Sequence, residues 1–492
     1  MNKKLIILAL AAAFAMPATA QSYRLTFLPQ TPKGERYYLA QHFRDKFNLL
    51  DSVEIGKNGN TEKQFVFSGS NNLDRGVYTL LDSQKKKLFD FMVDDSRKFS
   101  IAFDEKCSNA GMTVKGSNAN TVMYAYMAKM DWANGRAKEL GELKTKDREK
   151  YNEEMKSISD EMTKYQDDYM KQYAKYRFTQ LISMSQNAKV PDELPANAKE
   201  TKLQDWQAIY YRTHYWDNMD LTDHSLIYTP HLFDRMNYYF FGVLYYQESD
   251  TITRYADMVL HKVENDSTML RYFLDFIAPK YQRATKNIGW DQVYVNLVQN
   301  YYLQGKCPWA TEADLYNKRN EIQFLGQSLI GAIGQELFMA DSNQSDNPKD
   351  WISSHRFPQR YVILWFWDPD CHHCQEQSEA LAHLYDSLSS TGNKPFEVYA
   401  VGYEADVAKW KRYIRTHNFP FVNVGGSNVN IDYQEAYNIH GAPTMIILDA
   451  DRRIIMNKTL PASGILPFLE RYEKEHPEMA TKVTHWMTST KK

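Results

Sequence analysis

Cysteine is scarce in this chain, which has only four cysteines in 492 residues. A long chain with so few cysteines is not held together by a disulfide framework. Cys107 and Cys307 stand alone in the sequence, and we interpret each as a buried thiol, with a bridge between them left open. An excess of one charge is also missing, because 59 basic and 61 acidic residues leave a formal net charge of −2. This balance argues against nucleic acid as a partner.

Long apolar runs are missing after the first residues of the chain. The sequence begins with a short basic segment, an apolar stretch from Leu5 to Met16 and the small residues Ala18-Thr19-Ala20. This order predicts a cleaved secretory signal peptide over residues 1–20, since the apolar stretch is too short to span a bilayer. We therefore expect an exported protein with no stable membrane insertion.

The sequence pattern changes twice after this segment, which predicts three domains. Residues 21–117 contain short alternating apolar runs separated by turn residues, a pattern typical of a small antiparallel β-sandwich. Residues 121–320 switch to helical spacing. Their clearest feature is an apolar stripe on a long charged helix: Tyr151, Met155, Ile158, Met162, Tyr165 and Tyr169. We interpret this stripe as a packing seam between helices.

The last part of the chain, residues 325–480, alternates between strands and helices. Apolar runs predict strands at residues 361–367, 396–401, 421–424, 445–448 and 453–456, with a closing helix near residues 466–475. Alternation that ends in a hairpin predicts a mixed α/β sheet. The expected protein is therefore multidomain, with an N-terminal β-sandwich, a central all-α region and a C-terminal α/β fold.

Two of the four cysteines, Cys371 and Cys374, lie three residues apart where a predicted strand meets a predicted helix. At the start of a helix, unpaired backbone N–H groups and the positive end of the helix dipole stabilise a thiolate. We therefore expect Cys371 to ionise more readily than an ordinary thiol. A thiolate with a second thiol one helical turn away can attack a disulfide and then be released by its neighbour, which is dithiol–disulfide exchange.

The segment Cys371-His372-His373-Cys374 also contains four potential zinc ligands. Consecutive residues at a helix start cannot all face one ion, and no second Cys-x-x-Cys completes a tetrahedral site. We therefore predict no metal and no cofactor.

Three features of the C-terminal part together resemble the thioredoxin superfamily, in particular the exported TlpA/ResA-like thiol-disulfide oxidoreductases. They are Phe366-Trp367 before the cysteines, the Cys-His-His-Cys segment, and Tyr437-Asn438-Ile439-His440-Gly441-Ala442-Pro443-Thr444 before an apolar strand. The resemblance covers residues 325–480 and implies a thioredoxin-like fold. It also implies a cis bond at Pro443 beside the cysteines, and substrate contacts from Ala442, Pro443 and Trp367.

Two positions depart from that family. Thioredoxin has a buried aspartate where this chain has Trp365, and the TlpA/ResA-like class often has a glutamate where this chain has Gln377. The sequence therefore does not identify the group that takes the proton from Cys374. His372 and His373 are the candidates that tune the pair, because a protonated imidazole beside a thiolate stabilises it and makes the disulfide more oxidising.

The upstream regions resemble domains of unknown function that precede thioredoxin modules in exported Bacteroidota proteins. The matching segments are residues 114–117, 215–220 and 301–309. This resemblance implies an architecture and a periplasmic location, and it indicates no activity.

Together these features predict a periplasmic thiol-disulfide oxidoreductase that acts on protein disulfides, as a reductase. Cys371 is the expected nucleophile and Cys374 the resolving cysteine, with a membrane protein as candidate electron donor. The rival hypothesis is a non-catalytic exported binding protein that uses a thioredoxin-like domain as a docking surface.

Overall fold

The computed structural model describes residues 22–195, 201–283, 288–341, 351–392, 394–403 and 406–482. The predicted signal peptide, residues 1–20, lies outside the described residues. The chain divides into two compact units between Val243 and Leu244, so the helical region expected over residues 121–320 is shared between them. The fold class predicted from the sequence is confirmed: strand sheets come first, then helices, then a mixed α/β sheet.

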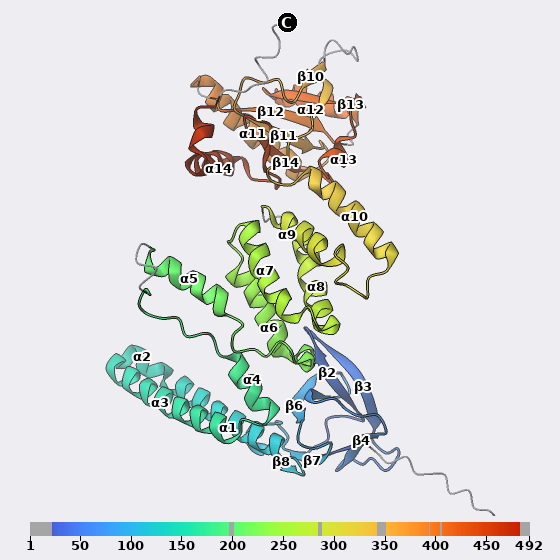
Figure 1. Ribbon diagram of the computed structural model, residues 1–492, viewed down its shortest axis with the longest axis vertical. Helices are drawn as coiled ribbons and strands as arrows, with labels where there is room; N and C mark the ends of the chain where they lie inside the picture. Colours follow the sequence, from blue (N-terminus) through green and yellow to red (C-terminus); the bar gives the residue numbers. More distant parts are fainter. Residues whose placement is uncertain are drawn as a thin grey trace, which may run out of the picture. The chain divides into compact units, whose positions relative to one another are not determined.

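The first unit begins with two four-stranded sheets, in the orders β4-β1-β7-β8 and β3-β2-β5-β6 (Figure 1). The two sheets face each other through aromatic side chains, since the ring of Phe27 in one sheet contacts Phe89 and Phe91 in the other. The expectation of a purely antiparallel sandwich was wrong: β1 and β7 pair in parallel, which is possible because a long connection and not a hairpin joins them. The strands are β1 (Tyr23–Pro29), β2 (Arg36–Phe43), β3 (Lys46–Glu54), β4 (Phe65–Gly69), β5 (Gly76–Leu81), β6 (Lys87–Val93), β7 (Lys98–Phe103) and β8 (Thr113–Lys115).

The helices of the first unit follow directly after these strands. They are α1 (Asn118–Glu139), α2 (Leu143–Lys146), α3 (Arg148–Gln172), α4 (Arg177–Ser185), α5 (Leu203–His214) and α6 (Pro230–Tyr238). The apolar stripe lies on α3, where the rings of Tyr165 and Tyr169 have their centroids 6.0 and 4.7 Å from that of Tyr126 in α1. The interpretation of the stripe as a packing seam is therefore confirmed for its C-terminal end, Tyr165 and Tyr169.

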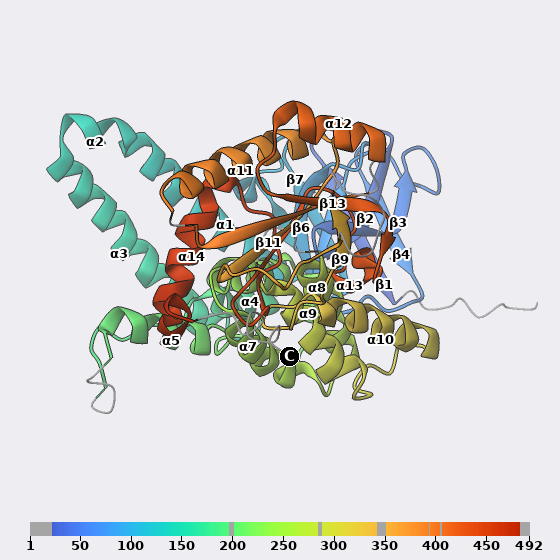
Figure 2. The same cartoon turned by 90° about the horizontal axis from the view of Figure 1, so that it is seen from above.

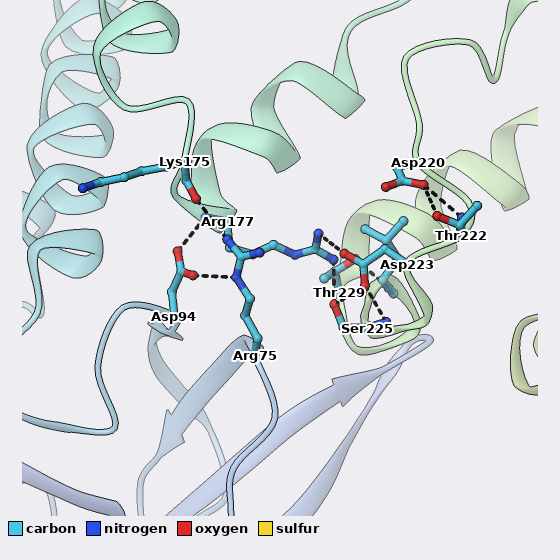
Figure 3. Close-up of polar contacts among 10 residues, drawn as sticks. Arg75, Asp94, Lys175, Arg177, Asp220, Thr222, Asp223, Ser225 and Thr229 are labelled. Atoms are coloured by element: carbon cyan, nitrogen blue, oxygen red, sulfur yellow. Dashed lines mark hydrogen bonds and ion pairs between the residues drawn. The ribbon is translucent and has the colours of Figure 1, made fainter.

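A buried arginine at the start of α4 joins the sandwich to the helices of the first unit (Figure 3). The backbone N–H of Arg177 donates to Asp94 after β6, at 2.6 Å, and Arg75 pairs with the same carboxylate. The Arg177 guanidinium pairs with Asp223 and donates to Ser225 at 2.8 Å. A charge buried this deeply needs such partners. The network therefore fixes the start of α4 against the end of β6.

Four α-helices precede the sheet in the described residues of the second unit. They are α7 (Ser249–Val263), α8 (Ser267–Gln282), α9 (Trp290–Leu297) and α10 (Glu312–Gln327). Buried apolar residues dominate α8 and α9, which pack on each other. No helix within the described ranges combines the length and the apolar character needed to cross a membrane.

A seven-stranded mixed sheet forms the rest of the second unit, in the order β10-β9-β13-β12-β11-β14-β15. All seven residues of β11 are buried, because helices α11, α12 and α14 cover one face of the sheet and α13 covers the other (Figure 2). The elements are β9 (Phe338–Asp341), β10 (Trp351–Ser353), β11 (Tyr361–Trp367), α11 (His372–Ser390), β12 (Phe396–Gly402), α12 (Val407–His417), β13 (Val422–Val429), α13 (Tyr433–Ala436), β14 (Thr444–Leu448), β15 (Ile454–Met456) and α14 (Ala462–Glu475). β9 and β10 were not predicted.

Candidate functional site

The two cysteines lie at the junction between β11 and α11. β11 ends at Trp367, a short turn follows, and Cys371 is the N-cap residue of α11. The turn is closed by a 3.2 Å hydrogen bond from the Cys371 N–H to the carbonyl of Asp368. The Cys371 Sγ accepts the N–H of Cys374 at 3.2 Å, so the sulfur sits at the position where a helix start stabilises negative charge.

The two thiols differ in their exposure. Cys371 is half-buried, whereas Cys374 is fully buried and belongs to the core between the sheet and its helices. Burial, followed by the hydrogen bond to Cys371, raises the pKa of the Cys374 thiol. A molecule that approaches from solvent therefore meets Cys371 before Cys374.

This difference predicts the order of chemical modification. When the reduced, folded chain is treated briefly with iodoacetamide, we expect Cys371 to be alkylated well before Cys374. The reagent cannot reach the buried Cys374 sulfur, and the raised pKa of Cys374 keeps its thiol protonated. Mass spectrometry of tryptic peptides measures the order, and the difference should vanish in urea. Equal rates at both cysteines in the folded chain would contradict the burial seen here.

The loop before β14 lies beside the cysteines. The Ala442–Pro443 peptide bond is cis, as the resemblance implied, and the carbonyl oxygen of Ala442 is 3.9 Å from the Cys371 Sγ. The hydroxyl of Thr444 donates to the carbonyl of Gly441 at 2.7 Å, which closes the turn that carries the proline. Ala442 and Pro443 are partly exposed, so their backbone is accessible from solvent beside the Cys371 sulfur.

One candidate for substrate binding is wrong. Trp367 is fully buried, with its ring against those of Tyr413 and Phe419 at 5.7 and 5.5 Å between centroids. Its indole therefore holds the end of β11 against α12 and the loop after it, and it offers no surface to a partner.

The two histidines lie on the solvent side of the first turn of α11. His372 and His373 have 84% and 63% of their side chains exposed, and they lie 3.4 and 3.7 Å from the carboxylate of Glu376. Within the described ranges, no three histidine, cysteine, aspartate or glutamate side chains are grouped closely enough to hold a metal ion. Cys107 and Cys307 are both free thiols, and burial raises the pKa of Cys307 to about 12.

Sequence reasoning passed over one residue of this site, Asp368. It follows β11 directly, it is only partly exposed, and burial raises the pKa of its carboxyl group. The negative charge of Asp368 also raises the pKa of the Cys374 thiol. The available signal was an aspartate placed between a fully apolar strand and the cysteines, since a carboxyl group at such a position is partly withdrawn from water.

The geometry agrees with a comparison of the sequence with known families. Residues 359–454 match the family model described as thioredoxin-like. The C-terminal part of this chain is a thioredoxin-like domain. Residues 143–322 match a domain of unknown function, DUF5106, in agreement with the upstream resemblance. No curated protein matches the chain.

Several solved structures are similar to parts of the chain. A thioredoxin-like protein from Bacteroides caccae is 17% identical, and the match covers 58% of this chain and 98% of that protein, with a TM-score of 0.46. A domain of a possible thiol-disulfide isomerase from Cytophaga hutchinsonii is 28% identical over 30% of this chain and 96% of that domain, with a TM-score of 0.26. The thioredoxin domain of a thiol-disulfide oxidoreductase from Bacteroides vulgatus is 21% identical over 29% of this chain and 96% of that domain, with a TM-score of 0.24.

Proposed function

We propose that this protein is a thiol-disulfide oxidoreductase that acts on protein disulfides through Cys371 and Cys374. The observation that carries the proposal is the pair of thiols at the start of α11, one reachable and one buried, next to the cis Ala442–Pro443 bond. A docking surface alone has no need for a reachable thiol at a helix start with a second thiol one turn away.

The chemistry takes two steps. The Cys371 thiolate attacks one sulfur of a substrate disulfide, which forms a mixed disulfide and releases the other substrate sulfur as a thiolate that takes up a proton. The Cys374 sulfur, after losing its proton, then attacks Cys371, so that a Cys371–Cys374 disulfide forms and the second substrate thiol leaves. The backbone of Ala442 holds the substrate as an added extended strand during both steps.

The direction and location of the reaction are part of the same proposal. We assign a reductase in the periplasm, recharged by dithiol exchange with a membrane electron donor, because the sequence resembles exported reductases of that kind. His372 and His373 are exposed on the first turn of the same helix. A proton on either imidazole would stabilise a thiolate at the helix start, which shifts the couple towards the oxidising end of the superfamily range without changing the donor that drives it.

A reduction assay tests the proposal. The chain, kept reduced by dithiothreitol, should accelerate the reduction of insulin disulfides, and its own couple should titrate against glutathione between about −270 and −120 mV. A potential below about −300 mV, together with no insulin reduction, would instead identify a structural bridge and support the rival docking protein.

A further inference from the structure

The second step of the proposed reaction leaves one proton without an acceptor. The Cys374 thiol must lose its proton before its sulfur can attack the mixed disulfide on Cys371. This thiol is fully buried, and its pKa is raised by burial and by the hydrogen bond to Cys371. At neutral pH only a small fraction of such a thiol is ionised. Rapid attack of Cys374 on the mixed disulfide therefore needs a base close by.

The positions that hold an acidic residue in related proteins do not provide this base. Trp365 is fully buried and donates its indole N–H to Ser378 at 2.8 Å. Gln377 carries an amide, which does not accept a proton near neutral pH.

Two glutamates on α11 are engaged elsewhere. Glu379 accepts the hydroxyl of Tyr413 at 2.9 Å and lies 3.7 Å from His417. Glu376 is exposed and faces the two histidines of the Cys-His-His-Cys segment. Neither carboxylate is oriented by a contact with the cysteines.

Asp368 is held next to both cysteines by the turn that it opens. Its carbonyl accepts the N–H of Cys371 at 3.2 Å, and its Oδ1 accepts the N–H of Asp370 at 2.8 Å. A hydrogen bond from the Asp368 backbone lowers the pKa of the Cys374 thiol, whereas the negative charge of the Asp368 carboxylate raises it. Because the carboxylate is partly withdrawn from water, the pKa of Asp368 is raised, which makes it a better base than an exposed aspartate.

We propose that Asp368 is the base that takes the proton of Cys374 during resolution. The inference rests on the proposed function. The Cys374 thiol gives its proton to the Asp368 carboxylate, directly or through one water, and the sulfur attacks Cys371. The bond from Cys371 to the substrate sulfur breaks, and the departing thiolate takes the proton back from the Asp368 carboxyl group. Protons and electrons then balance, and Asp368 returns to its starting state.

The neighbouring charges provide a matched control. The positive charge of Lys409 on α12 lowers the pKa of Asp368. The Nζ of Lys409 forms an ion pair with Asp370. Asp370 is exposed, two residues further along the same turn, and directly before Cys371. Asp368→Asn and Asp370→Asn therefore remove the same charge from the same turn. In the Asp368→Asn variant the amide oxygen of the new side chain can still accept the Asp370 N–H, so the turn itself is kept.

Stopped-flow reaction with dithiobis(nitrobenzoate), an aromatic disulfide whose released thiolate is yellow, separates the two steps. The reduced full chain is used in a Cys107→Ser background. The first release of colour reports the attack by Cys371, and the second reports resolution by Cys374. The aromatic thiolate leaves without needing a proton, so the second phase isolates the base. We expect Asp368→Asn to leave the first phase nearly unchanged and to slow the second on the order of 10²-fold near pH 7, with Asp370→Asn close to wild type.

The pH dependence of the second-phase rate, and whether Asp368→Asn slows or speeds that phase, distinguish a base from a neighbouring charge. In Asp368→Asn the second phase should rise about tenfold per pH unit, because Cys374 must ionise unaided, whereas the wild-type rate should level off once Asp368 is ionised. If Asp368 were only a neighbouring charge, its removal would favour the Cys374 thiolate and speed the second phase. A faster or unchanged second phase overturns the inference, as does equal slowing in Asp370→Asn. Absence of the first phase in wild type would instead overturn the proposed function.

Discussion

Replacing Cys371 by serine is expected to abolish disulfide reduction by this protein. Cys371 is the only one of the two thiols that an external disulfide can reach, because Cys374 is fully buried behind it. A serine hydroxyl stays protonated and does not attack a disulfide, so the rate of insulin reduction should fall on the order of 10³-fold or more. The measurement is the turbidity of precipitating insulin in the presence of dithiothreitol.

Replacing Cys374 by serine should give a different failure. Cys371 can still attack, but no second thiol releases the substrate, so the chain should accumulate in mixed disulfides that appear on non-reducing gels and disappear with excess reductant. Cys107→Ser is the control, since it removes a half-buried thiol from the first unit and should retain full activity. Full activity in Cys371→Ser, or no trapped complex in Cys374→Ser, would show that this pair is not the reactive centre.

The strand–helix junction was predictable because its signals are local. An unbroken apolar run predicts β11, and the spacing of Leu381, Leu384 and Leu388 predicts α11, so the position of Cys371 at a helix start follows from neighbouring residues alone. The cis bond at Pro443 came from the family resemblance and not from any local pattern.

The errors have a common cause, which is contact between residues far apart in the sequence. Trp367 adjoins the reactive turn, but Tyr413 and Phe419 arrive much later in the chain and cover it. The parallel pairing of β1 with β7 likewise joins two strands that are separated in the sequence by β2 to β6. Asp368 was missed because its chemistry depends on burial, and burial is set by the folded environment of the turn.

Replacing Trp410 by alanine is expected to destabilise the thioredoxin-like domain more than any change at its surface. Trp410 lies on α12, only 1% exposed, and packs over two glycines of the sheet. A Cβ atom on Gly402 or Gly425 would come within 2.9 or 3.0 Å of its ring, so these glycines leave the space that the indole fills. Removing a buried tryptophan side chain costs about 3–5 kcal/mol in the free energy of unfolding.

The buried Cys374 provides a way to measure this loss in the full chain. In a Cys371→Ser background, the urea concentration at which Cys374 becomes open to alkylation reports unfolding of the domain around it. Trp410→Ala should lower that concentration strongly and Trp410→Phe much less, since the indole N–H has no hydrogen-bond partner among the described residues. Val407→Ala, an exposed position on the same helix, should change it little. If Trp410→Ala behaved like Val407→Ala, α12 would not be an integral part of the domain core. The packing of α12 on the sheet would then not be what holds Lys409 beside Asp370 and Asp368.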